Sequence, residues 1–434
     1  MVDVVIAKTE RLTGEVYAPS SKAYTQRTLI AALLSHGTSR ILNPLVSDDT
    51  KVTLRAVKAF GARVKLQKDC WTIEGATPIQ TPETRIDCNE SGATLRFMIP
   101  VAALASDSSI FSLGGSLKRR PVKALLQCLK QLGVRTRLQQ NNGSSSVMVQ
   151  GGGISGGKAA IRGDVSSQFI SGLLFACPMA KADTEITLTT PLESKNYVRM
   201  TEEILAKHSI KISRSDGFEH LQVPSNQIYS PCTHEIEGDF SSAAFLLAAG
   251  AIIPSKVCIK NLASSSIQGD KAIVDILTKM GSNIEVGNGQ IEVKGDGSLL
   301  DAVDIEAKDI PDLVPVCAVL ACRSKGTSRI YAAQRLRYKE SDRLTSLYTE
   351  LKKMGAEVAM GKDSLIINGP CALHGNIITA HEDHRIAMAC AIAALNADGT
   401  TRIKDAECVK KSYPTFFDDL RALGVNIIGG KFDR

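Results

Sequence analysis

The sequence is poor in aromatic residues and has no long hydrophobic run. Of its 434 residues, 5% are Phe, Trp or Tyr, and Trp occurs once. Proteins that bind single-stranded nucleic acids stack bases on aromatic side chains, so this composition disfavours that class. No stretch approaches 18 uninterrupted apolar residues, and the first residues lack the apolar core of a signal peptide. We therefore expect no membrane-spanning or secretory segment.

Cysteine occurs without any metal-binding pattern. The eleven cysteines form no C-x-x-C pair, and Cys177, Cys317 and Cys390 lie within apolar runs. Such residues are typical of reduced core thiols in a cytoplasmic protein. The segment HEDHR at 381–385 lacks the H-E-x-x-H spacing and has no cysteine beside it, so we expect no metal site.

A glycine-rich run, GGGISGGKA at 151–159, resembles a phosphate-binding loop only superficially. In such loops a Ser or Thr follows the lysine to bind magnesium, and a helix comes next. Here Ala159 follows the lysine, and the next residues have the pattern of a strand. We therefore predict a flexible turn.

The charge balance is mildly basic. Lys and Arg number 52 against 45 Asp and Glu, which gives a formal net charge of +7, and 44% of the residues are hydrophobic. This is an ordinary globular composition, and the basic excess favours small anionic ligands over nucleic acid as partners.

One structural pattern recurs six times along the chain. A helix end, a Gly or Ser turn and a strand-like run repeat every 69 to 76 residues, at Gly61, Gly133, Ser209, Gly281, Gly355 and Gly424. Helix openings repeat at a similar step, at Ser20–Ser21, Ser91–Gly92, Ser166–Ser167, Ser241–Ser242, Ile310–Pro311 and His384–Arg385. Six copies of one α/β unit, each with two helices and three or four short strands, explain both series.

Small α/β units of this kind bury their helices only by packing together. We predict two domains of three copies each, with helices inside and sheets outside. One domain comprises residues 1–19 and 239–434, and the other comprises residues 20–238. The capped helix ends should converge on the cleft between the domains, where we expect the active site.

Cations lie at several of the helix openings. Lys22 falls in a first helical turn, where the helix dipole disfavours a cation by about 1 kcal/mol or less, and Arg27 lies just beyond it. An anion bound between these cations and the helix N–H groups would explain them. Solvated basic residues on a surface helix are the alternative, and the same choice applies to Lys118–Arg120 ahead of Pro121.

The densest charged cluster is RLRYKESDR at 335–343, which leads into an amphipathic helix. Lys339 and Arg343 are one helical turn apart with Glu340 between them, so a salt-bridged helix start is the simplest interpretation. Asp312 is expected in another first turn, where a carboxylate suits the helix dipole whether or not it has a catalytic role.

Nine segments together resemble the enolpyruvyl transferases, and within that family the members that act on shikimate 3-phosphate. They are SKAYTQR at 21–27, SGATLR at 91–96, RRP at 119–121, SSQF at 166–169, EGDFSSAAF at 237–245, IPD at 310–312, KESDRL at 339–344, DHR at 383–385 and KSYP at 411–414. The resemblance covers essentially the whole length. It implies a two-domain inside-out α/β barrel of six βαβαββ repeats, three per domain, which closes on its substrates.

The resemblance also implies a reaction, in which the enolpyruvyl group of phosphoenolpyruvate passes to the 5-hydroxyl of shikimate 3-phosphate and phosphate is released. No metal or organic cofactor takes part, and the reaction belongs to aromatic amino-acid biosynthesis. The implied catalytic residues are Asp312 as the base, Glu340 for proton transfer at the methylene carbon, and Lys22. With Lys22 and Lys339 favouring ionised Asp312 and burial opposing it, we expect the two effects on its pKa to cancel in part.

The implied binding residues form two sets. Shikimate 3-phosphate would contact Lys22, Arg27, Ser166, Ser167, Gln168, Ser194, Asp312 and Lys339. Phosphoenolpyruvate would contact Lys22, Gly92, Arg120, Gln168, Arg343, Arg385 and Lys411. Two phosphates and a carboxylate need several cations, which these sets supply.

Four positions depart from the family pattern. Ala23, Glu90, Ala93 and Arg335 stand where the family usually has Ser, Asn, Thr and Asn, respectively. These changes affect fine substrate contacts and leave the residues of the reaction in place.

Two other functions compete with this interpretation. UDP-N-acetylglucosamine enolpyruvyl transferase shares the fold, but it has a reactive cysteine in the loop that reads SLKRRP at 116–121 here, whereas Cys128 lies in the next helix. A basic RNA-binding protein would suit the net charge, but the cations are dispersed over many helix openings. We expect a cytoplasmic monomer with small-molecule substrates and with no nucleic-acid or membrane partner.

Overall fold

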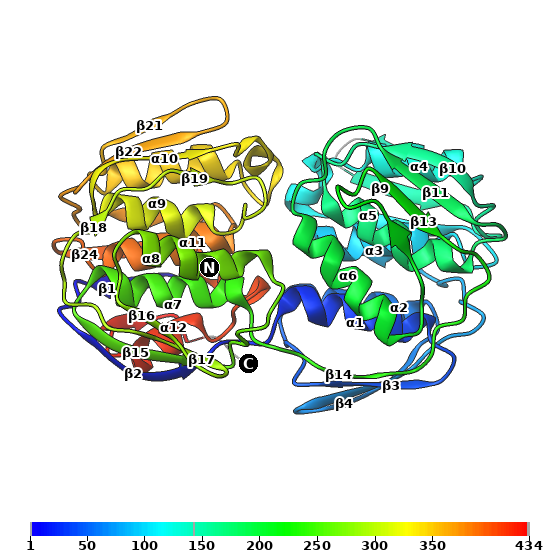
Figure 1. Cartoon of the computed structure of the whole chain (residues 1–434), viewed down its shortest axis with the longest axis horizontal. Helices are drawn as coiled ribbons and strands as arrows, with labels where there is room; N and C mark the ends of the chain where they lie inside the picture. Colours follow the sequence, from blue (N-terminus) through cyan, green and yellow to red (C-terminus); the bar gives the residue numbers. More distant parts are fainter. Residues whose placement is uncertain (1, 142–143, 432–434) are drawn as a thin grey trace. The chain divides into compact units, whose positions relative to one another are not determined.

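The computed structural model describes residues 2–141 and 144–431. Within this part the chain divides into two compact units (Figure 1). We call Met1–Ser20 with Glu237–Arg434 the terminal unit, and Ser21–Ile236 the central unit. No helix in the described ranges is long and apolar enough to cross a membrane.

The central unit contains three four-stranded sheets and two helices for each sheet. Its helices are α1 (Lys22–Leu34), α2 (Asp48–Ala59), α3 (Gly92–Ala102), α4 (Lys123–Gln131), α5 (Ser167–Ala176) and α6 (Lys195–Lys207). The first sheet has the order β14 (Thr233–Glu235), β3 (Thr38–Leu42), β5 (Cys70–Glu74) and β4 (Arg63–Gln67). The second has the order β6 (Ile86–Asp87), β7 (Ser109–Leu113), β9 (Ser144–Val149) and β8 (Thr136–Asn141). The third has the order β10 (Gly157–Ile161), β11 (Thr184–Leu188), β13 (His220–Val223) and β12 (Ser213–Arg214).

The terminal unit repeats this plan. Its helices are α7 (Phe240–Ile252), α8 (Ala272–Lys279), α9 (Val314–Cys322), α10 (Arg343–Lys353), α11 (His384–Ala394) and α12 (Phe416–Ala422). One sheet has the order β16 (Ile284–Val286), β17 (Gln290–Val293), β15 (Ser255–Lys260) and β2 (Leu12–Tyr17). Another has the order β18 (Leu300–Asp301), β20 (Ser324–Tyr331), β22 (Leu365–Gly369) and β21 (Val358–Met360), with β19 (Ile305–Glu306) also paired to β20. The last has the order β23 (Ile377–Thr379), β24 (Thr400–Lys404), β1 (Val4–Ala7) and β25 (Ile427–Gly429).

Two parallel strand pairs fasten the chain where it passes from one unit to the other. β14, the last strand before the chain leaves the central unit, pairs with β3 and places His234 opposite Ile41. β2, the last strand before the chain enters that unit, pairs with β15 and places Val16 opposite Ile259. Each crossing strand therefore belongs to the sheet of the unit that it leaves, and the chain begins the other unit with a buried helix.

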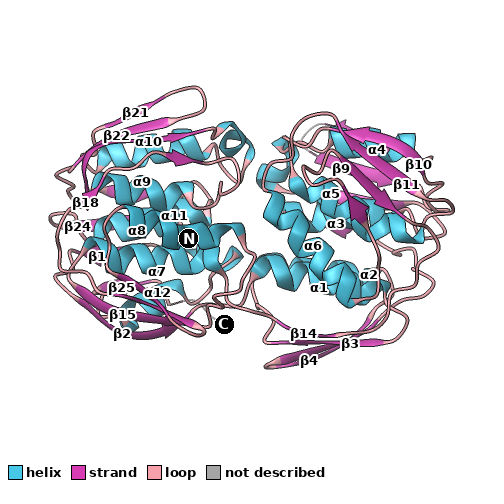
Figure 2. Cartoon of the chain, viewed as in Figure 1, coloured by secondary structure: helices cyan, strands magenta, loops and turns pink. Residues whose placement is uncertain are grey.

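The odd-numbered helices form the core of each unit. Nearly all of their residues are buried on every side, and most of these residues are apolar. The even-numbered helices bury one face, and the strands lie toward the outside of each unit (Figure 2). The predicted α/β architecture, with helices inside and sheets outside, is present in both units.

The six predicted turns after the even-numbered helices all have left-handed backbone. Five are glycines, with φ from +82° to +104°, and the sixth is Ser209 with φ of +66°. This conformation ends a helix and satisfies its last carbonyls, and glycine adopts it without a steric penalty. The glycine-rich run at 151–159 likewise forms a turn, with positive φ at Gly152 and Gly153 before β10 begins.

Candidate active site

A buried guanidinium organises the polar cluster of the terminal unit. Arg343 is the first residue of α10, and its side chain is 1% exposed. Its Nε and Nη2 donate to the two carboxylate oxygens of Asp383, over 2.8 and 3.2 Å. Its Nη2 also donates to Glu340 over 2.9 Å, and its Nη1 donates to Asp312 over 2.8 Å. Three carboxylates therefore fix the position of one cation.

Asp312 lies among three cations. Its Oδ1 accepts hydrogen bonds from Lys339 over 3.3 Å and from Arg343, and its Oδ2 lies 3.8 Å from Nη2 of Arg385. Burial alone would raise the pKa of Asp312, but these cations outweigh it and hold that pKa well below its usual range. We expected burial and the nearby cations to cancel in part, but the effect of the cations is larger, and Asp312 is ionised.

The position of Asp312 differs from the prediction in one respect. The expected helix opening at Ile310–Pro311 was wrong, because α9 begins at Val314 and Asp312 lies in the turn before it. Its interactions are therefore with the surrounding cations, and the helix dipole does not explain its position.

Lys339 lies at the end of a short 3-10 helix, Gln334–Tyr338, and burial lowers its pKa to about 8 despite the neighbouring carboxylates.

The guanidinium of Arg385 has an N–H donor, at Nε, that no group of the described residues accepts. It follows the α11 N-cap Asp383, whose carboxylate accepts a hydrogen bond from the Arg385 N–H over 2.9 Å. Its Nη1 donates to the carbonyl of Ser241 over 2.6 Å, while its buried Nε has no hydrogen-bond partner in the described residues. Lys411 ends a 3-10 helix, Ala406–Lys411, that packs against α11, and it is 6% exposed. An anion could accept a hydrogen bond from the spare donor of Arg385.

A second buried carboxylate lies close to this cluster. Asp270 is 1% exposed, and its Oδ2 accepts a hydrogen bond from the hydroxyl of Ser241. Burial and the negative charge of Asp312 raise the pKa of Asp270 to about 7. Near neutral pH Asp312 is therefore ionised, whereas Asp270 exchanges between its protonated and ionised forms.

In the central unit, the predicted residues cluster at helix N-termini. Lys22 begins α1 and forms an ion pair with Asp49 over 3.0 Å. Ser166 caps α5 by accepting from the N–H of Gln168, and Ser167 is the first helical residue. Ser194 caps α6 with left-handed backbone at φ of 57°. Helices α1, α3, α5 and α6 pack on one another, so these ends belong to one bundle.

Arg27 is already held by protein groups. It is 2% exposed, and its three nitrogens donate to the Thr201 hydroxyl and to the carbonyls of Ala23 and Tyr197, over 2.9 to 3.1 Å. Burial lowers its pKa to about 10. This geometry shows that Arg27 joins α1 to α6, and its predicted contact with a phosphate stays a prediction.

Two further arginines lie near α3 and α5. Gly92 begins α3, and a Cβ atom added there would lie 2.9 Å from Cζ of Arg120. Arg96, buried on α3, donates from Nη1 to Oε1 of Gln168 over 2.7 Å and thus connects the two helices. The structure therefore brings Gly92 and Arg120 together as predicted partners of one ligand, and it fixes the amide of Gln168.

The four departures from the family pattern occupy different environments. Ala93 is buried at the start of α3, and Ala23 is partly exposed on α1. Glu90 accepts a hydrogen bond from the N–H of Ser116 over 2.7 Å. Arg335 donates to the carbonyl of Lys308 over 2.9 Å. Glu90 and Arg335 therefore stabilise loops beside the predicted site residues.

Sequence reasoning missed the acidic partners of the cluster. Asp49 pairs with Lys22, Asp383 holds Arg343, and Asp270 accepts from Ser241. Arg96 appeared only as the last residue of the SGATLR segment, and its link to Gln168 was not expected. The DHR motif contained a signal for Asp383, but no spacing in the sequence pointed to Asp49 or Asp270.

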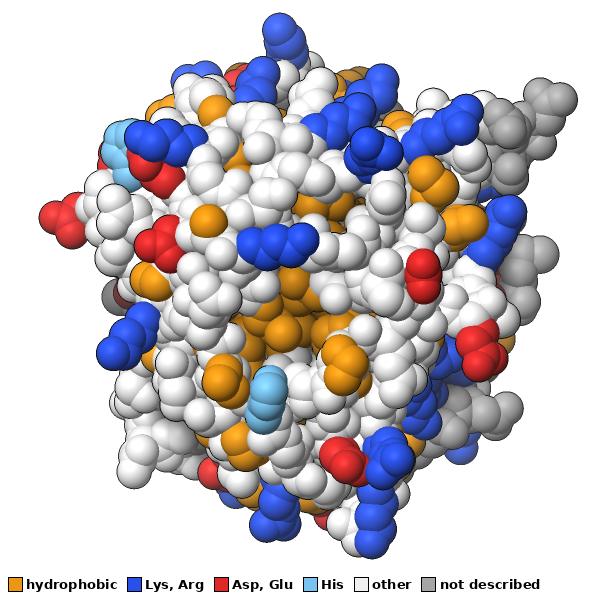
Figure 3. All heavy atoms as spheres, turned by 90° about the vertical axis from the view of Figure 1, so that its right-hand side faces the viewer, with side chains coloured by type: hydrophobic (Ala, Val, Ile, Leu, Met, Phe, Trp, Pro, Cys, Tyr) orange, Lys and Arg blue, Asp and Glu red, His pale blue; other side chains and the backbone are white. Residues whose placement is uncertain are grey.

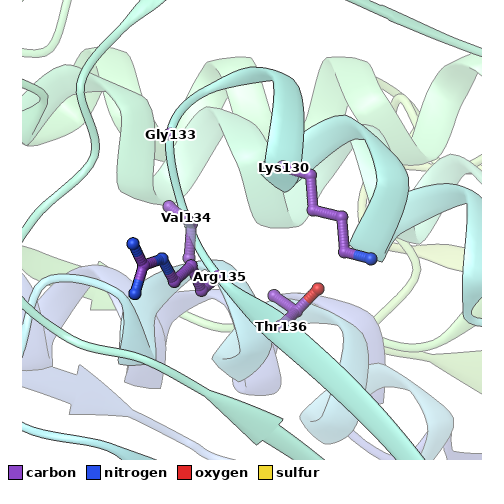
Figure 4. Close-up of a pocket in the computed structure, with 5 residues that line it drawn as sticks. All are labelled: Lys130, Gly133, Val134, Arg135 and Thr136. Atoms are coloured by element: carbon purple, nitrogen blue, oxygen red, sulfur yellow. The ribbon is translucent and has the colours of Figure 1, made fainter.

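A surface pocket elsewhere in the central unit is a different feature. It has a volume of about 400 Å³ and is lined by Lys130, Gly133, Val134, Arg135 and Thr136 (Figure 4). None of the predicted site residues lines it, so it is not the candidate active site. Among residues 2–141 and 144–431, no group of three or more His, Cys, Asp and Glu side chains is arranged to hold a metal ion.

Comparison with solved structures defines the class of fold. An EPSP synthase from Acinetobacter baumannii matches with a TM-score of 0.81 and 24% identity, covering 99% of this chain and 100% of that one. The enolpyruvyl transferase NikO from Streptomyces tendae matches with a TM-score of 0.81 and 19% identity, covering 99% and 98%. The chain thus has the two-domain α/β fold found in enolpyruvyl transferases.

Comparison of sequences defines the family within that class. The family model for EPSP synthase (3-phosphoshikimate 1-carboxyvinyltransferase) matches residues 6–420. A 3-phosphoshikimate 1-carboxyvinyltransferase from Methanocaldococcus jannaschii is 43% identical over 428 residues, covering 98% of this chain and 99% of the relative. One from Methanococcus maripaludis strain C6 is 40% identical over 427 residues, with the same coverage. The chain belongs to the EPSP synthase family.

Proposed function

We propose that the protein transfers the enolpyruvyl group of phosphoenolpyruvate to the 5-hydroxyl of shikimate 3-phosphate and releases phosphate, a step of aromatic amino-acid biosynthesis. Relatives named for this reaction are 38% to 43% identical over nearly the whole chain. The structural observation that carries the proposal is the set of cations, Lys339, Arg343 and Arg385, around an ionised Asp312. Such a set suits anionic substrates beside a base.

The cations of this set differ in what they can offer a substrate. Four hydrogen bonds to carboxylates occupy most of the donors of Arg343, which leaves one Nη1 hydrogen for phosphoenolpyruvate. Arg385 retains its Nε, and it would make the stronger contact with phosphate or carboxylate oxygens. Lys411 ends a 3-10 helix that packs against α11, and it would add a second charge.

The central unit would supply the remaining contacts. Gly92 and Arg120 would hold phosphoenolpyruvate, since the missing Cβ of the glycine leaves room for the guanidinium. Shikimate 3-phosphate would accept hydrogen bonds from the hydroxyls and N–H groups at the starts of α5 and α6, at Ser166, Ser167 and Ser194. Gln168 and Lys22 would contact both substrates, and Arg27 would contact the shikimate phosphate.

The proposed chemistry places Asp312 at the 5-hydroxyl. A carboxylate with a pKa well below its usual range is a weak base toward an alcohol. Proton removal must therefore accompany attack of the oxygen on the substrate carbon, while Glu340 or Lys22 delivers a proton to the methylene carbon. Correct positioning then contributes more to the rate than basicity.

The test measures phosphate release from phosphoenolpyruvate with shikimate 3-phosphate or UDP-N-acetylglucosamine as the acceptor. We expect turnover only with shikimate 3-phosphate, and turnover only with the sugar nucleotide would overturn the proposal. The structure supports the first acceptor, because the cysteine nearest to the relevant loop in the sequence, Cys128, is fully buried on α4 and burial raises its pKa to about 12.

The role of Asp312 has its own test. Asp312→Asn keeps the shape of the side chain and removes the base, so turnover should fall by roughly 10²- to 10⁴-fold with little change in substrate affinity. The control is Asp304→Asn, which alters an exposed carboxylate of the same unit that accepts a hydrogen bond from the N–H of Arg329. Near-normal turnover of the Asp312 variant would remove this residue from the mechanism.

We further propose that the protein is a cytoplasmic monomer that does not act on nucleic acid. On the face shown in Figure 3, Lys and Arg side chains are dispersed among polar and acidic ones and form no continuous basic stripe. A protein that follows a phosphate backbone would show steeply salt-dependent RNA binding, which we do not expect. Light scattering after gel filtration should give the mass of one chain, 46.5 kDa.

A further inference from the structure

Two cysteines distant in the sequence lie side by side in the terminal unit. Cys322 is the last residue of α9, and Cys371 lies two residues after β22. The N–H of Cys371 donates to the carbonyl of Cys322 over 2.8 Å, and α9 packs against β22. The main chain therefore holds the two residues side by side, and each thiol shifts the pKa of the other.

The two thiols have different environments. Cys371 is partly exposed, and its Sγ accepts a hydrogen bond from the N–H of Glu357 over 3.4 Å and donates one to the carbonyl of Asn368 over 3.3 Å. Cys322 is 2% exposed. The hydrogen bond from Cys322 outweighs burial and lowers the pKa of Cys371 to about 7, while the same contact and burial raise the pKa of Cys322. One thiol is thus accessible and partly ionised, and its neighbour is protonated and shielded.

Two other cysteines of the terminal unit lack this arrangement. Cys258 is also partly exposed, but burial and the nearby Glu15 raise its pKa. Cys390 lies near Cys322, yet it is fully buried and burial raises its pKa. Because the thiolate is the nucleophile in reactions with oxidants, Cys371 is the more reactive thiol.

We propose that Cys322 and Cys371 form a redox-modification site, in which hydrogen peroxide converts the dithiol into a reversible disulfide. The Cys371 thiolate attacks one peroxide oxygen, the O–O bond breaks, and hydroxide leaves, which gives a sulfenic acid. The sulfur of Cys322 then attacks the sulfenic sulfur, the S–O bond breaks, and the thiol proton leaves with the oxygen as water. The two sulfurs lose two electrons, and the peroxide is reduced to two molecules of water.

The disulfide would close a loop that carries part of the candidate active site. The segment between Cys322 and Cys371 includes α10 and the cluster residues Lys339, Glu340 and Arg343. The disulfide would close the loop between residues 322 and 371 and reduce the conformational entropy of the unfolded chain. Oxidation should therefore raise the melting temperature of the terminal unit by on the order of 5–10 °C. The inference does not depend on the proposed reaction, because it concerns only these thiols and their oxidation.

The experiment treats the full chain with hydrogen peroxide at pH 7, blocks the remaining thiols with N-ethylmaleimide, and measures intact mass and peptide linkage. We expect two thiols to be lost, a peptide pair linked through Cys322 and Cys371, and complete reversal by dithiothreitol. Cys371 should react about tenfold faster than Cys258, since its thiolate fraction is larger although each thiolate is less nucleophilic. Equal rates at the two cysteines, or the absence of the linked peptides, would overturn the proposal.

Two variants separate the roles of the thiols. Cys322→Ala should leave a sulfenic acid on Cys371 that dimedone traps, and Cys371→Ser should abolish both the trapping and the rise in melting temperature. Cys258→Ser is the control and should behave as the unmodified protein does. If the wild-type protein also accumulates the dimedone adduct at Cys371 without forming a disulfide, Cys322 is not its partner and the proposal fails. Circular dichroism checks that each variant is folded.

Discussion

A buried histidine pair in the central unit should make this unit sensitive to acid. His208 ends α6 and His234 lies on β14, and their Nε2 atoms are 2.8 Å apart. Nδ1 of His208 lies 2.7 Å from the carbonyl of Ser230, so that nitrogen carries the proton. Nε2 of His208 therefore accepts, and His234 donates. Each ring then carries one N–H and is neutral, and burial disfavours a further proton on either ring.

The magnitude follows from the pKa of His234. Burial is the largest cause that lowers this pKa from 6.5 to about 3, and repulsion by Lys207, and by His208 whenever its ring is protonated, acts in the same direction. Below pH 6.5 the unfolded chain binds a proton that the folded chain does not, so stability falls as the pH decreases from about 6.5 to about 3. Between pH 7.5 and pH 4.5 the loss is about 2.7 kcal/mol. The pKa of His208 is also lowered by burial, which adds in the same direction.

The single tryptophan allows this loss to be measured in the correct unit. Trp71 is buried on β5, in the sheet that contains β14, and it lies opposite Ile41, which also faces His234. Urea unfolding followed by Trp fluorescence at pH 7.5 and pH 4.5 therefore reports on this sheet. His234→Gln should lose about 2–3 kcal/mol less than the wild type between these pH values, whatever its stability at pH 7.5.

The control for the histidine experiment is His36→Gln, which changes an exposed histidine of the same unit. It should retain the full pH dependence of the wild type. If His234→Gln and the wild type lose the same free energy of unfolding between the two pH values, the acid sensitivity has another origin and the assignment of neutral rings is wrong.

Two further substitutions test the polar clusters. Asp383→Asn removes a carboxylate that binds buried Arg343 through two oxygens, so urea unfolding followed by circular dichroism should show a loss of about 3–5 kcal/mol, and an unchanged midpoint would contradict this. Gly92→Ala places a Cβ 2.9 Å from Cζ of Arg120 and should displace this flexible guanidinium. KM for phosphoenolpyruvate should rise about tenfold with little change in melting temperature, and an unchanged KM would place Arg120 outside the binding site.

The repeat pattern predicted the architecture because its signals are local. Each turn after an even-numbered helix needs left-handed backbone, and glycine marks five of the six positions directly. Helix starts were predicted correctly where the capping side chain was recognised, as at Ser21, Ser91 and Ser166. The prediction at Ser241–Ser242 was wrong, since Asp239 caps α7 and both serines lie inside the helix.

The contacts of the site could not be predicted in the same way, because they join residues that are far apart in the sequence. The Arg343–Asp383 pair spans 40 residues, and the Lys22–Asp49 pair spans 27. No periodicity encodes these separations, since they depend on how neighbouring repeats pack. The types of residue were predictable from the motifs, whereas their ionisation states required the partners that the fold supplies.

The environment of Asp312 suggests that substrate binding increases its strength as a base. In the absence of ligand, Lys339, Arg343 and Arg385 hold its pKa well below the usual range. An anion bound to Lys339 and Arg385 would neutralise part of their charge and would exclude water, and both changes raise the pKa of a carboxylate.

This coupling can be read from the pH dependence of the rate. The acidic limb of kcat reports the enzyme with substrate bound, and that of kcat/KM reports the free enzyme. If Asp312 is the base, the acidic limb of kcat should therefore lie at higher pH than that of kcat/KM. Arg385→Lys keeps a positive charge but loses the planar set of donors, so it should weaken phosphoenolpyruvate binding and reduce the difference between the two limbs. Coincident limbs in the wild-type enzyme would show that the bound anions do not act on Asp312 through these cations.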